Sequence, residues 1–204
     1  MRRLTRVDFE KISKDMQDRG MNIPVKGVEI NIPNATEILH SALTHFVSKQ
    51  APGTTMQWKE EYNLVGKWLE NNQGKGLLLY GPCGLGKTII ARYCIPAILL
   101  NFKRLIIRTF DTNEMNKDPE FVLSKHLIGI DDFGTEEVSV AYGNKRMVLT
   151  EILDLAEKKG KLLILTTNLS AEQIAKKYGA RAYDRILALT TRVQLNGTSF
   201  RTKR

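Results

Sequence analysis

Apolar positions change their spacing along this chain, and the change falls near Gly76. Beyond it, short and nearly continuous apolar runs alternate with amphipathic stretches of helical period. The apolar runs predict strands at 77–80, 105–110, 127–131 and 162–166. The amphipathic stretches predict helices from residue 87, after Asp118-Pro119 and over 145–159, and Pro96 should kink or end the first of them. Because strands that are apolar on both faces need cover on both sides, we expect an α/β fold with a parallel sheet flanked by helices on both faces.

The part of the chain before Gly76 has a mainly helical pattern. It predicts a helix that ends before Arg19, helices over 35–49 and 58–70 with Asn34 as a candidate cap, and a short strand at 28–32. The Ala-Pro-Gly sequence at 51–53 breaks this pattern. We interpret residues 1–57 as an N-terminal helical extension, which either covers the edge of the core or docks a partner. Residues 58–204 are interpreted as the core domain.

The composition fits one globular domain. The chain has 204 residues, of which 42% are apolar, and a formal net charge of +9. Its apolar runs are far shorter than the roughly 20 residues of a membrane span, and no apolar segment follows the basic start, so we expect a cytoplasmic protein without a membrane partner. The two cysteines and three histidines lack metal-ligand spacing. The positive charge suits an anionic partner such as nucleic acid, although solubility alone explains it equally well.

Residues 81–88 carry the strongest chemical signal in the chain. They read G-x-x-x-x-G-K-T between a predicted strand and a predicted helix, which is the context of a phosphate-binding P-loop. Glycine backbones curl around phosphates, and the N-terminus of the following helix favours their negative charge. We expect Lys87 to reach the β and γ oxygens of ATP and Thr88 to ligate Mg²⁺. The predicted nucleotide-binding residues are Gly81, Pro82, Cys83, Gly84, Leu85, Gly86, Lys87, Thr88 and Ile89.

A pair of carboxylates follows the strand predicted at 127–131. In an open α/β sheet the ligand lies beyond the carboxyl ends of the strands, so Asp131 and Asp132 should face the phosphates. One carboxylate can hold Mg²⁺ while its neighbour orients the attacking water. We assign Asp131 to the metal and Asp132 to catalysis, as a base or a water-positioning group. Two turn-forming aspartates at a solvated strand end are the alternative interpretation.

Two further groups are candidates for the same site. Asn168 follows the strand at 162–166 and can contact a γ-phosphate or its water, unless it caps the helix that begins near Ser170. Arg181 and Arg185 are four residues apart in a helical stretch and therefore share a face. An arginine supplied by a neighbouring subunit can stabilise charge on the γ-phosphate, although a solvated basic face fits this pair equally well.

Four segments occur in a specific order. They are the P-loop with its strand, Ile-Asp-Asp-Phe-Gly-Thr-Glu at 130–136, Thr-Thr-Asn-Leu-Ser at 166–170 and Gly-Ala-Arg-Ala-Tyr-Asp-Arg-Ile at 179–186. Together, over residues 58–201, they resemble the DnaC-type helicase loaders of the AAA+ class and the related IstB-type transposition ATPases. The resemblance implies metal and hydrolysis roles for Asp131 and Asp132, a sensor role for Asn168, and a finger role for Arg185 in a neighbour's site. The segment 193–201 resembles the family's closing strand and its Gly-x-Ser-aromatic-Arg end, which implies that Arg201 contacts nucleotide or DNA.

The resemblance implies a P-loop NTPase with an AAA+ core, and the short sequence after Arg185 leads us to expect no C-terminal helical lid. The leading hypothesis is an ATPase of DNA replication that couples its ATP state to assembly on single-stranded DNA and a replicative helicase, as a homo-oligomer when ATP is bound. An IstB-like helper ATPase with a transposase as its partner is the alternative. A small-molecule P-loop kinase and a nucleotide-dependent binding module with little turnover are the other hypotheses.

Overall fold

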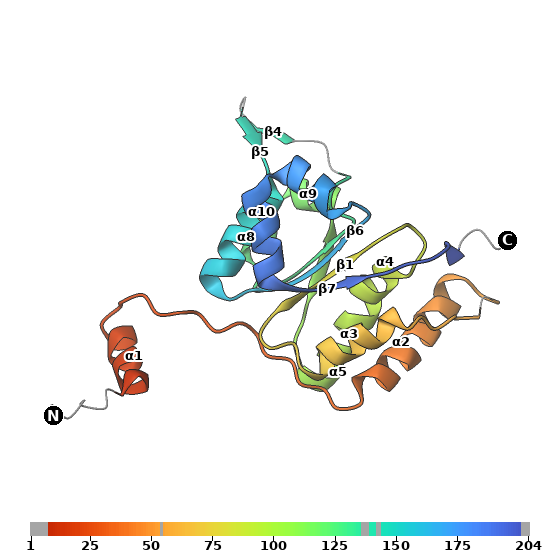
Figure 1. Ribbon diagram of the computed structural model, residues 1–204, viewed down its shortest axis with the longest axis horizontal. Helices are drawn as coiled ribbons and strands as arrows, with labels where there is room; N and C mark the ends of the chain where they lie inside the picture. Colours follow the sequence, from red (N-terminus) through yellow and green to blue (C-terminus); the bar gives the residue numbers. More distant parts are fainter. Residues whose placement is uncertain (1–7, 54, 136–138, 142–143, 201–204) are drawn as a thin grey trace, which may run out of the picture.

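A five-stranded parallel sheet forms the centre of the computed structural model, which describes residues 8–53, 55–135, 139–141 and 144–200. The spatial order of its strands is β2-β3-β6-β1-β7; β6, β1 and β7 are labelled in Figure 1. Their bounds are β1 (Gly76–Tyr80), β2 (Arg108–Asp111), β3 (Leu127–Asp131), β6 (Leu162–Thr167) and β7 (Thr190–Gln194). Because all neighbours are parallel, the carboxyl ends of the strands meet at one edge of the sheet. The expected parallel sheet is confirmed.

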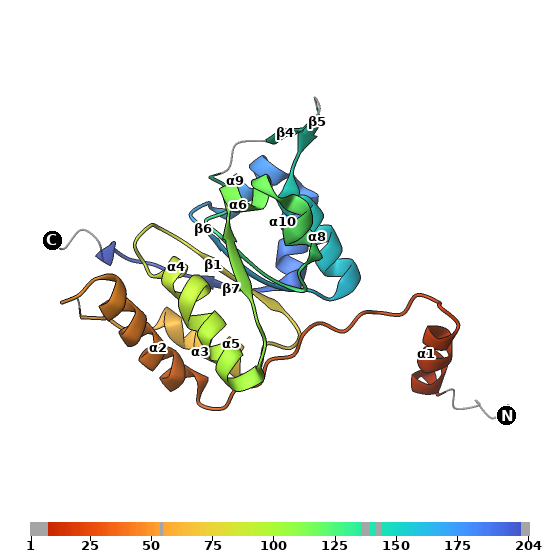
Figure 2. The ribbon, with the colours of Figure 1, turned by 180° about the vertical axis from the view of Figure 1, so that it is seen from behind.

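Helices cover both faces of the sheet, as the apolar pattern predicts (Figure 2). One face carries α2 (Ala35–Gln50), α3 (Glu61–Glu70) and the helix after the P-loop. The other carries α7 (Pro119–Ser124), α8 (Val148–Lys159), α9 (Ala171–Tyr178) and α10 (Ala180–Leu189), and α6 (Thr112–Lys117) follows β2 directly. Leu77 and Leu79 of β1 pack with the first layer and Leu78 with the second. Within the described residues, no helix combines the length and the apolar character needed to cross a membrane.

The segment before α2 packs on the core but does not form the strand expected at 28–32. Two of its backbone groups bond to the side chain of Asn72, a buried residue between α3 and β1: Asn72 Oδ1 accepts from Ile30 N–H at 2.7 Å, and Nδ2 donates to Val28 O at 2.8 Å. Ile32 N–H donates to Leu69 O at 3.0 Å. These hydrogen bonds satisfy an extended backbone without a neighbouring strand. Further upstream, α1 (Phe9–Asp18) lies apart from the sheet and its helices, beyond an extended connection (Figure 1).

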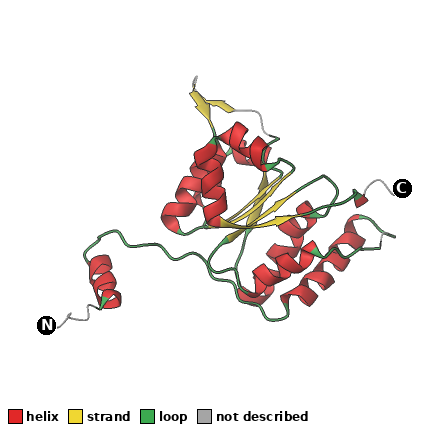
Figure 3. Ribbon diagram, in the orientation of Figure 1, coloured by secondary structure: helices red, strands yellow, loops and turns green. Residues whose placement is uncertain are grey.

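Three other local expectations differ from the structure. The helix expected from residue 145 begins at Val148, because 144–146 form β5 (Asn144–Arg146), which pairs antiparallel with β4 (Ser139–Ala141) in a small hairpin (Figure 3). The strand expected from residue 105 begins at Arg108, because Leu105 N–H donates to Leu99 O and closes the preceding helix. Asn34 occupies the N-cap position of α2, but its side chain makes no capping hydrogen bond.

The helix after the P-loop continues beyond Pro96, where the sequence led us to expect a kink or an end. It runs as α4 (Lys87–Ile89), the π-helical turn η1 (Ile90–Cys94) and α5 (Ile95–Lys103). In the π turn Ile95 N–H donates to Ile90 O, and the proline, which has no N–H, follows at once. The carbonyl oxygen of Ala91 accepts instead from the Thr109 hydroxyl of β2, at 3.1 Å. The wider turn therefore accommodates the proline without leaving this carbonyl unpaired.

Candidate nucleotide site

The P-loop connects β1 to α4 at the carboxyl edge of the sheet. Gly81 and Gly84 have positive φ angles of 133° and 79°, a conformation that other residues rarely adopt. A Cβ atom on Gly81 would lie 2.1 Å from Leu195 O, and one on Gly84 would lie 2.0 Å from Ser199 Oγ. These two glycines therefore permit both the curled backbone of the loop and the close approach of the segment after β7.

Lys87 begins α4 and is buried, with 6% of its surface exposed. Its ammonium group donates to the carbonyl oxygens of Gly81 and Pro82, both at 2.7 Å. The side chain therefore folds back along the P-loop and holds its positive charge there. Thr88 follows in the same helix, and its hydroxyl donates across to Asp131 Oδ1 at 3.2 Å.

Asp131 ends β3 as a buried carboxylate that is contacted at both oxygens. Oδ1 accepts from the hydroxyls of Thr88 at 3.2 Å and Thr166 at 2.7 Å, and Oδ2 lies 3.6 Å from Arg92 Nε. A carboxylate beside a threonine hydroxyl supplies the hard oxygen donors that Mg²⁺ prefers. In the described residues no group of three His, Cys, Asp or Glu side chains could hold a metal ion.

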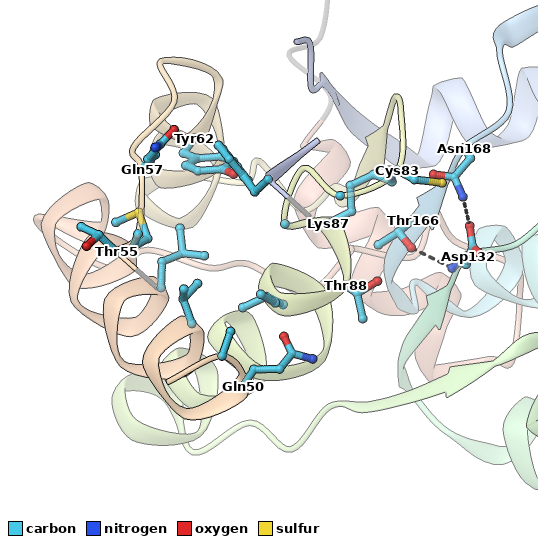
Figure 4. A pocket seen from close by; sticks show the side chains of 18 of the residues that line it. Gln50, Thr55, Gln57, Tyr62, Cys83, Lys87, Thr88, Asp132, Thr166 and Asn168 are labelled. Carbon is cyan, nitrogen blue, oxygen red and sulfur yellow. Dashed lines mark hydrogen bonds between the residues drawn. The ribbon is translucent and has the colours of Figure 1, made fainter. Parts of the chain in front are cut away.

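Asp132 lies directly after the strand in the left-handed conformation, with φ at 56°. Its N–H donates to Thr166 Oγ1 at 2.7 Å, and its Oδ1 accepts from Asn168 Nδ2 at 2.6 Å (Figure 4). The unusual backbone conformation turns the second carboxylate away from β3 and toward the end of β6. Thr166 therefore joins the two aspartates, since it contacts the side chain of Asp131 and the backbone of Asp132.

A pocket of about 880 Å³ opens over these groups. Lys87, Thr88, Asp132 and Asn168 line one part of it (Figure 4). The other part is formed by α2 and the segment after it, with the side chains of Leu43, Val47, Gln50, Met56 and Gln57. Sequence reasoning missed this second wall, because none of its residues carries phosphate or metal chemistry and only the break at 51–53 distinguishes the segment.

Tyr62 of α3 ties this second wall to the P-loop. Its buried hydroxyl donates to Leu85 O at 3.0 Å, and Trp58 packs edge-on against its ring with centroids 5.4 Å apart. Burial, assisted by the charge of Glu61 and then by Cys94, raises the pKa of Tyr62 well above its usual value. The hydroxyl therefore stays protonated and keeps its donor role over the whole physiological range.

The segment after β7 crosses the P-loop. Phe200 N–H donates to Gly84 O at 3.0 Å, and the Phe200 side chain lines the pocket. Lys59 Nζ donates to Asn196 O at 2.9 Å and lies 5.1 Å from the centroid of the Phe200 ring. The segment is thus held at the P-loop and at the start of α3. Arg201, the candidate contact of the sequence, lies outside the described residues.

The two candidate arginines of α10 lie apart from this pocket and do not line it. Arg185 Nε donates to Glu157 Oε2 at 2.8 Å, and its guanidinium also pairs with Asp154, so α8 holds it through two carboxylates. The hydrogen bond to Glu157 is the main cause that raises the pKa of Arg185 further. Arg181 is exposed. The structure therefore brings the P-loop, both aspartates and Asn168 together. Arg181 and Arg185 lie outside this pocket.

No protein-family model matches the chain, and no curated protein matches it in sequence. Solved structures do share its fold. A structure described as the DnaC helicase loader has a TM-score of 0.59 and 21% identity, over 71% of this chain and 95% of that chain. A DnaI structure has a TM-score of 0.55 and 19% identity, over 82% of this chain and 96% of that chain.

A third structure, described as the replication initiator DnaA bound to AMPPCP and single-stranded DNA, has a TM-score of 0.52 and 17% identity. It matches over 82% of this chain and 51% of that chain. At such identities the likeness concerns the fold, which is the fold class expected from the sequence. The chain has an α/β fold with a five-stranded parallel sheet and a P-loop after β1, and it shares this fold with the structure described as the DnaC helicase loader.

Proposed function

We propose that this chain binds ATP with Mg²⁺ in the pocket beside the P-loop and hydrolyses it. One observation carries the proposal: a continuous set of hydrogen bonds joins Thr88, Asp131, Thr166, Asp132 and Asn168 at the mouth of that pocket. Side chains from the ends of two strands, β3 and β6, and from the helix α4 are thereby fixed around one point. A P-loop that served only as a turn would not need such an arrangement of carboxylates.

Each residue has a separate role in this proposal. Lys87 exchanges its carbonyl partners for β and γ oxygens, and Thr88 with Asp131 holds the metal. Mg²⁺ bound there would neutralise charge on the β- and γ-phosphate oxygens. Asp132 positions the attacking water or takes its proton, and Asn168 holds the Asp132 carboxylate in place and reaches the γ-phosphate. The second wall of the pocket, which includes the apolar side chains of Leu43, Val47 and Met56, receives the adenine base of ATP.

The partners that we propose are single-stranded DNA and a replicative helicase. The net charge of +9 supports an anionic partner. The names of the DnaC helicase loader and of the DnaA complex with single-stranded DNA support these two partners over a transposase. We further propose a homo-oligomer in which an arginine of α10 completes a neighbour's site, which explains why α10 carries arginines away from its own pocket.

Phosphate release with and without single-stranded DNA tests the proposal. We expect slow release of free phosphate from MgATP, and we expect the DNA to stimulate it. Lys87→Ala should lose both ATP binding and phosphate release. Release of free phosphate also distinguishes an ATPase from a kinase. A kinase transfers the phosphoryl group to an acceptor other than water and therefore forms ADP without free phosphate. An unmodified chain that binds no ATP would overturn the proposal.

A further inference from the structure

Arg92 lies at the centre of the π turn and contacts three carboxylates. Its Nε is 3.6 Å from Asp131 Oδ2, its Nη2 donates to Glu114 Oε2 at 3.2 Å, and the same Nη2 is 3.8 Å from Asp111 Oδ2. The guanidinium is largely enclosed, with 27% of the side chain exposed, while the Asp131 side chain is 9% exposed. A cation therefore stands beside the one carboxylate oxygen of Asp131 that the threonines do not contact.

The backbone explains why Arg92 reaches this position. Pro96 cannot donate to the helix, and the π turn before it adds a residue to the helical register. The freed Ala91 carbonyl accepts from Thr109 on β2, so the turn is fastened to the sheet immediately before Arg92. The next residue, Arg92, then faces the ends of β2 and β3, where Asp111 and Asp131 lie side by side in register. π turns of this kind occur frequently at functional sites.

We propose that the charge of Arg92 beside Asp131 Oδ2 sets the Mg²⁺ requirement of the site; this rests on the proposed function. The two hydroxyls on Oδ1 and the guanidinium beside Oδ2 leave the carboxylate one orientation. The guanidinium also opposes a second cation at Oδ2, because like charges a few ångströms apart repel. Asp111 and Glu114 attract the guanidinium toward the end of β2 and reduce its repulsion of a cation at Asp131 Oδ2.

The test measures Mg²⁺ binding and needs no turnover. The full chain is mixed with a fluorescent ATP analogue, N-methylanthraniloyl-ATP, and the fluorescence is followed while Mg²⁺ is added. Without the arginine's charge, Arg92→Gln should reach half-saturation at roughly three- to tenfold less Mg²⁺ than the unmodified chain. Arg92→Lys keeps the charge and should restore most of the original requirement. Arg192→Gln, an exposed arginine on β7, is the matched control and should not change it.

Glu114→Gln gives an independent test with the opposite sign. Glutamine can keep the capping box that Glu114 forms with Asp111 at the start of α6, but the negative charge is lost. The half-saturating Mg²⁺ concentration should therefore rise by about two- to fivefold. An unchanged or higher Mg²⁺ requirement in Arg92→Gln, or equal behaviour of Arg92→Lys and Arg92→Gln, would overturn the inference. If the unmodified chain binds no nucleotide, the proposed function itself fails; normal binding with unshifted Mg²⁺ dependence overturns the role of Arg92 alone.

Discussion

Asn168 donates its side-chain amide to Oδ1 of Asp132, at 2.6 Å. The two residues come from the ends of neighbouring strands, and Asp132 adopts a left-handed backbone conformation that few non-glycine residues take. Backbone strain of this kind persists where the surroundings fix it, and the bond from Asp132 N–H to Thr166 does so here. Asn168 and Asp132 therefore form one unit, and changes to either should affect the orientation of the same carboxylate.

Asp132→Asn should abolish most hydrolysis while it leaves ATP binding intact. The amide keeps the shape of the side chain but cannot accept a proton from water, so we expect phosphate release to fall at least about 10²-fold. ATP affinity, measured by calorimetry, should change little because Asp132 does not hold the metal in the proposed site. Asp18→Asn, on the distant α1, serves as the control for charge. Equal loss of binding and release would contradict the role of Asp132.

Asn168→Ala should lower phosphate release by about tenfold, because the Asp132 carboxylate loses the donor that orients it. A double-mutant cycle with Asp132→Asn tests whether the two act together. If they do, the double variant should be scarcely slower than Asp132→Asn alone, since effects within one unit are not additive. Fully multiplicative effects would show that Asn168 works independently of Asp132.

The parts of the structure that sequence predicts best are those with a local signal. The P-loop and the paired aspartates each follow an apolar strand, and parallel strands bring their ends to one edge of a sheet, so their proximity followed from pattern alone. The strand expected at 28–32 failed because its partner is the side chain of Asn72, more than forty residues along the chain. Nothing in the local apolar spacing reports such a long-range hydrogen bond.

The second wall of the pocket and the π turn were missed for related reasons. Leu43 and Met56 look like ordinary core residues, and only the packing of α2 beside the P-loop gives them a place at the pocket. Pro96 indicated a disturbed helix, but the sequence could not show that the helix would widen and continue. The partners of Arg185 also lie on another helix, so its ion pairs with Asp154 and Glu157 depended on tertiary packing.

A mixture of two inactive variants should recover activity if sites are shared between subunits. Lys87→Ala subunits lack ATP binding but keep their arginines, and Arg185→Ala subunits bind ATP but lack the finger proposed for a neighbour. Their equimolar mixture should release phosphate faster than the sum of the separate samples. Because Arg185 is paired with Asp154 and Glu157, it must leave these carboxylates to act in trans.

The same mixing experiment with Arg181→Ala identifies which arginine acts. Arg181 is exposed, so its substitution removes no ion pair with α8 and should cost little stability. Recovery with Arg185→Ala but full activity of Arg181→Ala alone would assign the finger to Arg185. If neither Arg185→Ala nor Arg181→Ala gains activity when mixed with Lys87→Ala, the result contradicts a site shared between subunits through these arginines.

Stability should fall in alkaline solution because of Cys94. Burial raises the pKa of the Cys94 thiol from 9.0 to about 12, so between these values the unfolded chain releases a proton that the folded chain keeps. The stabilisation is complete below pH 9 and is lost as the pH rises toward 12, at about 1.4 kcal/mol per pH unit. Tyr62, whose pKa is also raised by burial, adds to the loss at the upper end.

Urea unfolding at pH 8, 9 and 10 measures this loss. Cys94→Ala should flatten the dependence between pH 9 and 10, although the variant will be less stable overall because it leaves a small cavity. Cys83→Ala, at an exposed position, should retain the dependence of the unmodified chain. An equally steep fall in Cys94→Ala would assign the effect to other groups.

The pocket walls come from α2 and from the segment after β7, with Leu43 on one side and Phe200 on another. The central strand β1 also pairs with β7, which places Gly76 beside Thr190. Strands so distant in sequence pair late, because the entropy of loop closure opposes their meeting. A growing chain therefore has no complete pocket until β7 has been synthesised and has joined the sheet. A nucleotide that binds only the finished fold would then protect newly completed chains from proteolysis.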